Sequence, residues 1–223
     1  MEETNMTKAY IFDLDGTLAD TLESLIYSVK ASLREMGLVE ITDEQCRQFV
    51  GNGARYLMDH AIRAAGDEKG ERLEEAMRVY GRIFDENCTY HVTPYDGMVE
   101  VLEKLKEKGI KLAVLSNKPH RQTLKVARAV FGEHMFDCIQ GQKDGIRRKP
   151  DPEGVYRILR QLEVKEEASV YVGDSEVDLE TGKRAGIRTI PVGWGFRTCQ
   201  ELKKAGADTI LEKPAELLRF AEG

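Results

Sequence analysis

The sequence predicts an α/β protein: a doubly wound parallel sheet with a small helical domain inserted into it. Short apolar runs rich in branched and aromatic residues alternate with amphipathic stretches at helical spacing along most of the chain. Alternating strands and helices form parallel crossover units, so helices are expected on both faces of the sheet. One segment, from about residue 20 to residue 88, instead has helical spacing throughout and no convincing strand.

The predicted sheet is built from short apolar runs that are bounded by turn residues. Helices are expected between these runs, over residues 97–109, 121–132 and 152–163. In a sheet of this kind, ligands bind beyond the carboxyl ends of the strands. The predicted strands are residues 8–14 (KAYIFDL), 111–116 (KLAVLS), 169–174 (SVYVGD), 189–193 (TIPVG) and 208–211 (DTIL).

The inserted segment begins with an apolar stripe at helical spacing, which has Asp20 or Thr21 as its cap and Gly37 as its stop. Thr42 followed by Gln45 has the pattern of a capping box and starts a second helix. The stripe contains Leu22, Leu25, Ile26, Val29, Leu33 and Met36, and residues 53–65 and 68–87 extend the helical set. The predicted domains are an α/β core of residues 1–18 and 90–223 and a helical cap of residues 19–89.

Composition excludes several classes of protein. With 223 residues and 41% apolar side chains, the chain can bury a substantial core. A net charge of -6 and a pI near 5.4 argue against general binding to nucleic acid or to an anionic membrane. No run approaches the ~18 apolar residues of a membrane span, and the polar N-terminus lacks a signal peptide's apolar run, so a cytoplasmic protein is expected.

The four cysteines do not indicate a metal or redox motif. Cys46, Cys88, Cys138 and Cys199 are scattered, and no pair has CxxC spacing. Reduced thiols in the core are therefore expected.

The chemistry is predicted to centre on the string DLDGT, which ends the first strand. Asp13 and Asp15 are two positions apart, so in extended backbone both side chains leave the same face. Two carboxylates at such a short separation do not both ionise readily unless a cation compensates their charge. A lone DxD is often a solvated turn. At ~1/20 per fixed position, however, DxDGT is expected by chance in about one chain in a thousand of this length.

DLDGT resembles the first motif of the haloacid dehalogenase superfamily of phosphatases. The family's second motif, a Ser or Thr that closes an apolar strand, is matched by Ser116 in KLAVLSNKP. Its third motif, a Lys, is matched by Lys149 in RRKPDP, although Arg147 or Arg148 offers similar charge. Lys149 is preferred because KPxP is the usual form in the family.

The fourth motif of the family, an acidic cluster after an apolar strand, is matched by GDSEVD. It contributes Asp174 and Asp178. Ser175 and Asp178 also form the S-x-x-D pattern of a helix capping box, so Asp178 has a structural reading as well. Because all four motifs occur in the expected order, the resemblance covers essentially the whole chain and implies a Rossmann-like core with a cap.

The resemblance also implies the roles of the acidic residues. Asp13 is the nucleophile that forms an aspartyl-phosphate, and Asp15 is the general acid and then the general base. The implied cofactor is Mg²⁺, which prefers hard oxygen ligands. Its ligands would be the Asp13 carboxylate, the Asp15 backbone carbonyl and Asp174, with Asp178 as an outer or alternate ligand.

Phosphate binding is implied for a second group of residues. Ser116 would donate a hydrogen bond to a phosphoryl oxygen, and Lys149 would offset the phosphate charge and orient Asp13. Backbone amides around Leu14, Gly16 and Asn117 would complete the anion cradle.

The inserted helices are expected to select the substrate. The segments VGNGARYLMDHAI and GWGFRT look like parts of phosphoglycolate phosphatases, so the leading substrate is a small phosphomonoester such as 2-phosphoglycolate. Arg55 is a candidate ligand for its carboxylate, although an exposed surface arginine is the other interpretation. Pyrophosphatase, beta-phosphoglucomutase and non-catalytic binding proteins remain alternatives. Oligomeric state is not predicted, because no long heptad repeat is present.

Overall fold

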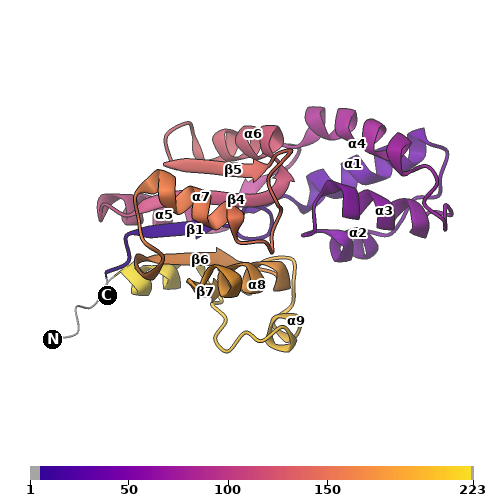
Figure 1. Cartoon of the computed structure of the whole chain (residues 1–223). Coiled ribbons are helices and arrows are strands. Elements are labelled where there is room, and N and C mark those ends of the chain that lie inside the picture. The colour runs from indigo at the N-terminus through magenta and orange to yellow at the C-terminus, as the bar shows by residue number, and fades with distance from the viewer. Residues whose placement is uncertain (1–5, 222–223) are drawn as a thin grey trace.

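The computed structural model describes residues 6–221, and within them a five-stranded parallel sheet forms the centre of the larger part of the molecule (Figure 1). The strand order is β5-β4-β1-β6-β7, with every neighbouring pair parallel. The first strand therefore lies in the middle, and residues that follow it emerge at the centre of the carboxyl edge. The strands are β1 Ala9–Phe12, β4 Lys111–Pro119, β5 Cys138–Gln142, β6 Ser169–Gly173 and β7 Arg188–Pro191.

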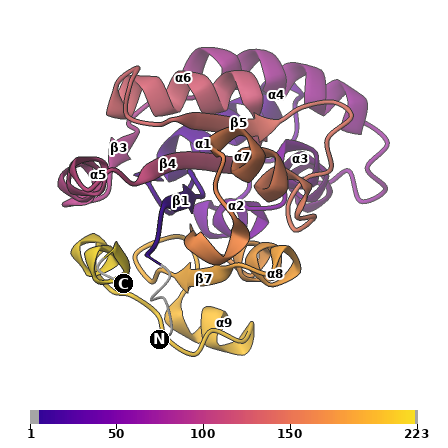
Figure 2. The ribbon, with the colours of Figure 1, turned by 60° about the vertical axis from the view of Figure 1, so that its left-hand side comes forward.

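Helices cover both faces of this sheet, which confirms the predicted doubly wound fold (Figure 2). Side chains alternate along β1, so Tyr10 and Phe12 join one buried cluster while Ala9 and Ile11 join another. The first face is covered by α5 Met98–Glu107, α6 His120–Phe131 and the 3-10 helix η2 Pro214–Ala221, and the second by α7 Glu153–Leu162 and α8 Glu176–Ala185. In the chain, the short element η1 Glu166–Ala168 lies between α7 and α8, and α9 Cys199–Lys204 lies between α8 and η2.

The inserted segment forms a separate group of helices beyond the carboxyl ends of the strands (Figure 1). The chain enters and leaves this group through β2 and β3, which pair as an antiparallel two-stranded sheet. The domain bounds given above stay a prediction. The elements are β2 Ala19–Asp20, α1 Leu22–Glu35, α2 Asp43–Phe49, α3 Ala54–Ala64, α4 Leu73–Asn87 and β3 Thr93–Pro94.

The helix starts of the inserted segment follow the predicted caps. Thr42 and Gln45 form the capping box of α2, since the Gln45 backbone N–H donates to Thr42 Oγ1 and the Thr42 N–H donates to Gln45 Oε1. At α1, Thr21 occupies the cap position, but the Asp20 carboxylate accepts the Leu22 N–H. The Thr21 hydroxyl is thereby left to act elsewhere.

Three details of the predicted elements were wrong. Residues 208–211 do not form a strand, because Leu211 makes a single bridge to Val192 before the chain turns into η2. The strand β5 was missed because its sequence, CIQGQ, has two glutamines and a glycine in place of a branched apolar run. Helix α4 begins at Leu73 rather than at residue 68, after turns that include Gly70.

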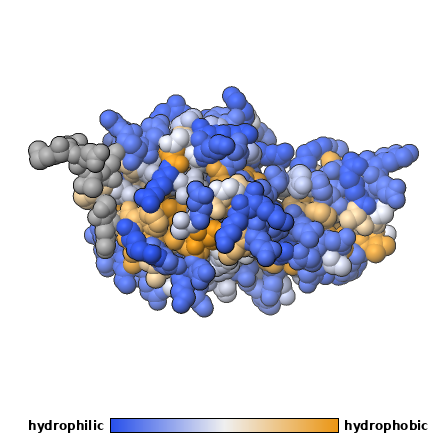
Figure 3. Space-filling view, turned by 90° about the horizontal axis from the view of Figure 1, so that it is seen from below, coloured by the Kyte–Doolittle hydropathy of each residue, from blue (hydrophilic) through white to orange (hydrophobic). Residues whose placement is uncertain are grey.

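Three of the four cysteines are buried, as expected, and one is exposed. Cys46, Cys88 and Cys138 are buried free thiols, whereas Cys199 is exposed at the start of α9 and is not part of the core. On the face shown in Figure 3, polar and charged side chains predominate, with apolar ones gathered between them. Among residues 6–221, no helix is both long and apolar enough to cross a membrane.

Two glycine substitutions test the packing of the missed strand. A Cβ at Gly141 of β5 would lie 2.7 Å from both the Lys118 carbonyl oxygen and the His120 Cα, which are backbone atoms that cannot rotate away. Gly141→Ala is therefore expected to lower the free energy of unfolding by about 1–3 kcal/mol in urea denaturation. Gly81→Ala, in α4 with open space around it, should raise it by about 0.5–1 kcal/mol. Equal effects of the two variants would contradict this account.

Candidate active site

Asp13 and Asp15 directly follow the carboxyl end of β1. Asp13 is buried, and its Oδ1 accepts the Leu14 backbone N–H at 2.7 Å and lies 3.0 Å from Lys149 Nζ. Asp15 is held through one oxygen as well. Its Oδ1 accepts the Thr21 hydroxyl at 2.6 Å and Lys118 Nζ at 2.7 Å. In both carboxylates these contacts are made by Oδ1, and Oδ2 lies on the opposite side of the group.

The turn after Asp15 is possible only with glycine. Gly16 has φ +82, and a Cβ there would lie 2.3 Å from Asp174 Oδ2. Asp174 is in turn fixed by the Thr17 hydroxyl at 3.1 Å and by the Phe196 backbone N–H at 2.7 Å. The DLDGT turn and the end of β6 are therefore in direct contact.

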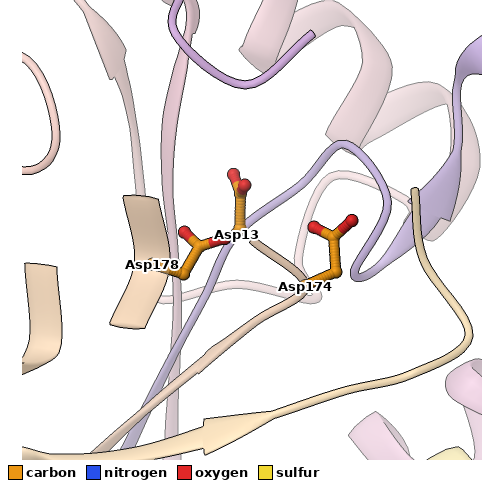
Figure 4. Close-up of side chains that lie close together, drawn as sticks. All are labelled: Asp13, Asp174 and Asp178. Carbon is orange, nitrogen blue, oxygen red and sulfur yellow. The ribbon is translucent and has the colours of Figure 1, made fainter. Parts of the chain in front are cut away.

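Three carboxylates form an acidic cluster at the edge of the sheet. Oxygens of Asp13, Asp174 and Asp178 lie within 4.8 Å of one another, and all three residues are buried. Figure 4 shows Asp13 and Asp174 projecting in the same direction, with Asp178 beside Asp13. Burial and the neighbouring Asp178 raise the pKa of Asp174 to about 7 against hydrogen bonds that lower it. Burial likewise raises the pKa of Asp13 well above its ordinary value, in spite of Lys149.

Lys149 is the buried cation of this cluster. Its Nζ lies 3.0 Å from Asp13 Oδ1 and 2.8 Å from Asp178 Oδ1, and its side chain is 3% exposed. Burial alone would lower the pKa of Lys149, but the two carboxylates outweigh it and raise the pKa. Three carboxylates around one ammonium leave excess negative charge. Hard oxygen donors with such an excess fit a divalent cation of the Mg²⁺ type.

Asp178 also has the structural role that its sequence pattern predicts. Its Oδ2 accepts the Ser175 backbone N–H at 3.1 Å and the Ser175 hydroxyl at 2.6 Å at the start of α8. Its Oδ1 accepts from Lys149 and from the Tyr171 hydroxyl at 3.1 Å. Each oxygen of Asp178 therefore accepts two hydrogen bonds, whereas each oxygen of Asp174 accepts one.

The end of β4 contributes Ser116 and Asn117. The Ser116 hydroxyl oxygen accepts the Lys118 N–H at 3.2 Å, and the side chain lines the central pocket. The Asn117 side chain joins two other segments, because its Nδ2 donates to the carbonyls of Gly51 and Lys149 at 3.0 Å while its Oδ1 accepts the Lys149 N–H at 2.9 Å. Asn117 therefore fixes the backbone that carries Lys149.

Asp13, Asp15, Ser116, Asn117 and Asp174 line one pocket between the sheet edge and the inserted helices, whereas Lys149 and Asp178 are not among its lining residues. Its cavity volume is about 40 Å³, so the pocket leaves room only for a small group. Polar groups form the side next to the sheet, and an apolar wall from the inserted segment forms the other. That wall contains Leu25, Val50, Leu57, Tyr80 and Phe84.

Arginines that the sequence offered as site residues lie elsewhere. Arg55 is exposed and its Nη2 lies 2.5 Å from Glu74 Oε1, so it is not among the residues that line the pocket. Arg147 pairs with Asp151 at 3.0 Å on the surface. Arg148 donates to the Asn52 carbonyl at 3.0 Å. Lys149, by contrast, is the basic residue of RRKP that reaches the carboxylates.

Two cations of the pocket were missed in the sequence. Lys118 follows Ser116 by two positions on β4, so the alternation of side chains along a strand was a signal for it. Arg197 belongs to the segment GWGFRT and pairs with Glu176 at 3.0 Å. Its Nη2 also donates to the Val50 carbonyl at 2.9 Å. No local pattern in the sequence predicts this long-range contact.

Proteins of known family resemble the chain along nearly its whole length. The family model described as haloacid dehalogenase-like hydrolase matches residues 10–192. The phosphoglycolate phosphatase of Aquifex aeolicus (strain VF5) is 32% identical over 215 residues, which cover 96% of this chain and 97% of that protein. The phosphoglycolate phosphatase of Haemophilus influenzae (strain ATCC 51907 / DSM 11121 / KW20 / Rd) is 31% identical over 212 residues, which cover 93% and 95%.

Solved structures match the fold as well. The crystal structure of a predicted phosphoglycolate phosphatase from Haemophilus somnus 129pt superposes with a TM-score of 0.89 at 26% identity, covering 97% of this chain and 98% of that one. CbbY from Rhodobacter sphaeroides, in complex with phosphate, gives a TM-score of 0.83 at 27% identity and covers 98% and 100%.

The acidic cluster predicts a stability that depends on pH and on metal. An acid whose pKa is raised on folding, as for Asp174, stabilises the folded protein at low pH, and this contribution is lost as the pH rises from its unfolded pKa toward about 7. Mg²⁺ competes with protons for the same carboxylates. Saturating Mg²⁺ should therefore raise the Tm of metal-free protein by about 5 °C at pH 8 and much less at pH 5.

Two matched variants test whether the Mg²⁺-induced rise in Tm depends on the acidic cluster. Asp174→Asn is expected to lose the Mg²⁺ shift at both pH values, while Asp208→Asn, at an exposed site, keeps it. Differential scanning calorimetry measures all three proteins. A wild-type shift retained by Asp174→Asn would exclude this cluster as the metal site.

Proposed function

The chain belongs to the haloacid dehalogenase-like hydrolase family and is a phosphatase, and we propose that its substrate is a small phosphomonoester, with 2-phosphoglycolate as the leading one. The family is shown by the model match over residues 10–192. The observation that carries the proposal is the convergence of Asp13, Asp15, Ser116 and Asp174 on one pocket at the carboxyl edge of the sheet.

In the first step, Asp13 attacks phosphorus. Its Oδ1 is occupied by the Leu14 N–H and by Lys149, which supports attack by Oδ2. The step forms an Oδ2–P bond and breaks the bond from phosphorus to the ester oxygen, leaving an aspartyl-phosphate. Ser116 donates to a phosphoryl oxygen, and Lys149 offsets charge on the transferred group.

Asp15 moves the protons. It gives a proton to the departing ester oxygen and then takes one from the water that attacks the aspartyl-phosphate. Because Thr21 and Lys118 hold Oδ1, Asp15 can turn little, and Oδ2 is the oxygen that exchanges the proton. A fixed general acid also reduces the entropy lost in reaching the transition state.

Mg²⁺ is the proposed cofactor, and the acidic cluster provides the donors for it. Asp13, the Asp15 backbone carbonyl and Asp174 would hold the ion, with Asp178 as an outer ligand. When bound, Mg²⁺ neutralises negative charge on the carboxylates and on the phosphoryl oxygens. Lys149 alone leaves that charge in excess, which is why a cation is needed.

The inserted helices, residues 19–89, act as the cap that excludes water. Several hydrogen bonds hold them on the core. Arg47 of α2 donates to the Phe196 carbonyl, and Arg197 donates back to the carbonyl of Val50 at 2.9 Å. Asn117 donates to the Gly51 carbonyl. With the apolar wall above them, the charged groups of the pocket act in a medium where electrostatic interactions are strong.

Asp13→Asn tests the mechanism. An amide cannot form the aspartyl-phosphate, so phosphate release from 2-phosphoglycolate should fall at least about 10³-fold in steady-state kinetics. Chelation of Mg²⁺ in the wild type should have a comparable effect, and Asp208→Asn should be indistinguishable from wild type. Undiminished turnover by a folded Asp13→Asn protein is incompatible with Asp13 as nucleophile.

A panel of phosphorylated metabolites tests the substrate. The value of kcat/KM for 2-phosphoglycolate is expected to exceed those for hexose phosphates and pyrophosphate by at least about tenfold, a difference of ~1.4 kcal/mol in transition-state binding. The apolar wall of the pocket gives the physical reason, since a hexose is bulkier than glycolate and the leaving group of pyrophosphate carries more charge against that wall. If a hexose phosphate or pyrophosphate equals 2-phosphoglycolate, this substrate assignment fails while the phosphatase activity stands.

A further inference from the structure

Lys118 is an almost fully buried ammonium group that faces the pocket beside the reacting residues. Its side chain is 1% exposed, and it lines the same pocket as Asp13 and Ser116. Its Nζ donates to Asp15 Oδ1 at 2.7 Å and lies 4.8 Å from the centre of the Phe84 ring. The cation thus sits between the general acid and the apolar wall of the cap, where the leaving group of a substrate must lie.

The hydrogen bonds of Lys118 leave capacity for a ligand. An ammonium group has three donors. One is used by Asp15, and among residues 6–221 no further hydrogen bond from Nζ is found. A buried cation with unused donors in a pocket favours an anionic partner, because water is excluded and the charge is poorly screened.

Arg197, the other cation of the pocket that sequence reasoning missed, is occupied by the protein itself. Its guanidinium pairs with Glu176 at 3.0 Å and donates to the carbonyls of Val50 at 2.9 Å and Arg47 at 3.5 Å. These partners belong to α8 and to the inserted segment. Arg197 therefore serves to hold the cap, and Lys118 remains for recognition.

We propose that Lys118 is the specificity-determining residue of the site and binds an anionic group on the leaving group, so that the enzyme selects small phosphomonoesters that carry a carboxylate next to the ester. This inference rests on the proposed function and extends it from one compound to a chemical class. The phosphoryl group lies at Asp13, Ser116 and Lys149. The leaving group extends toward Lys118, and its carboxylate accepts the free donors of Nζ.

Two substrates that differ in one group isolate this contact. 2-Phosphoglycolate carries the carboxylate, and 2-hydroxyethyl phosphate has the same two-carbon skeleton with an alcohol in its place. Loss of Lys118 also frees Asp15, which lowers turnover of both. The ratio of their kcat/KM values cancels that shared effect and reports recognition of the carboxylate alone.

The expected wild-type ratio is at least about tenfold in favour of 2-phosphoglycolate. Lys118→Met, which removes the charge at similar volume, should reduce the ratio by about tenfold or more, toward one, as for a lost hydrogen bond to a charged group. Most of the change should appear in KM. Lys118→Arg should retain a ratio above that of Lys118→Met, and Lys104→Met, an exposed control on α5, should match wild type.

The outcomes separate this inference from the function on which it rests. A wild-type protein that hydrolyses neither compound nor any other phosphomonoester overturns the proposed function. A wild-type ratio near one overturns the role of Lys118 even if a variant fails to fold, while phosphatase activity stands. An unchanged ratio in a folded Lys118→Met protein overturns it as well.

Discussion

Lys149 holds together the charged groups on which the rest of the site depends. A buried ammonium is costly unless it is paired, and Lys149 meets this condition by lying between Asp13 and Asp178. Asp13 follows β1 and Asp178 lies in the first turn of α8, after β6, so the pairing requires the ends of β1 and β6 and the loop after β5 to meet at one edge. Asn117 fixes that loop through two hydrogen bonds to the Lys149 backbone, and a third joins it to Gly51 of the inserted segment. The arrangement of the sheet and the position of the cation are therefore inseparable.

The same edge connects chemistry to selection of the substrate. One hydrophobic cluster runs from Phe12 on the sheet through Leu18 to Tyr80 and Phe84 in the inserted helices, so the two parts share a core. Where these apolar side chains reach the pocket, they form its apolar wall, opposite the acidic cluster. The chain thus places carboxylates that need a cation next to a surface that excludes water, which strengthens every charge interaction between them.

Much of this arrangement could be predicted from the sequence because it is written in local patterns. The strand of residues 169–173 (SVYVG) is a short run with two valines and a tyrosine at its centre, and DLDGT combines two carboxylates with a glycine whose φ no other residue adopts easily. What could not be predicted depends on contacts between distant segments. CIQGQ does not look like a buried strand, because it has a glycine at position 141, where the backbone of α6 comes too close for a side chain. The pairing of Arg55 with Glu74 joins residues nineteen positions apart. For Lys118 the alternation along β4 was a signal in the sequence, but its burial beneath the inserted helices depends on the fold.

The antiparallel contact between β2 and β3 has a consequence for how such a protein can change over time. Ala19 pairs with Pro94 and Asp20 with Thr93, so the two ends of the inserted segment lie side by side. A segment whose ends are adjacent can be lengthened, shortened or exchanged without altering the path of the chain through the sheet. The acidic edge can therefore be inherited unchanged while the helices above it are replaced, and new leaving groups become accessible to the same phosphoryl chemistry.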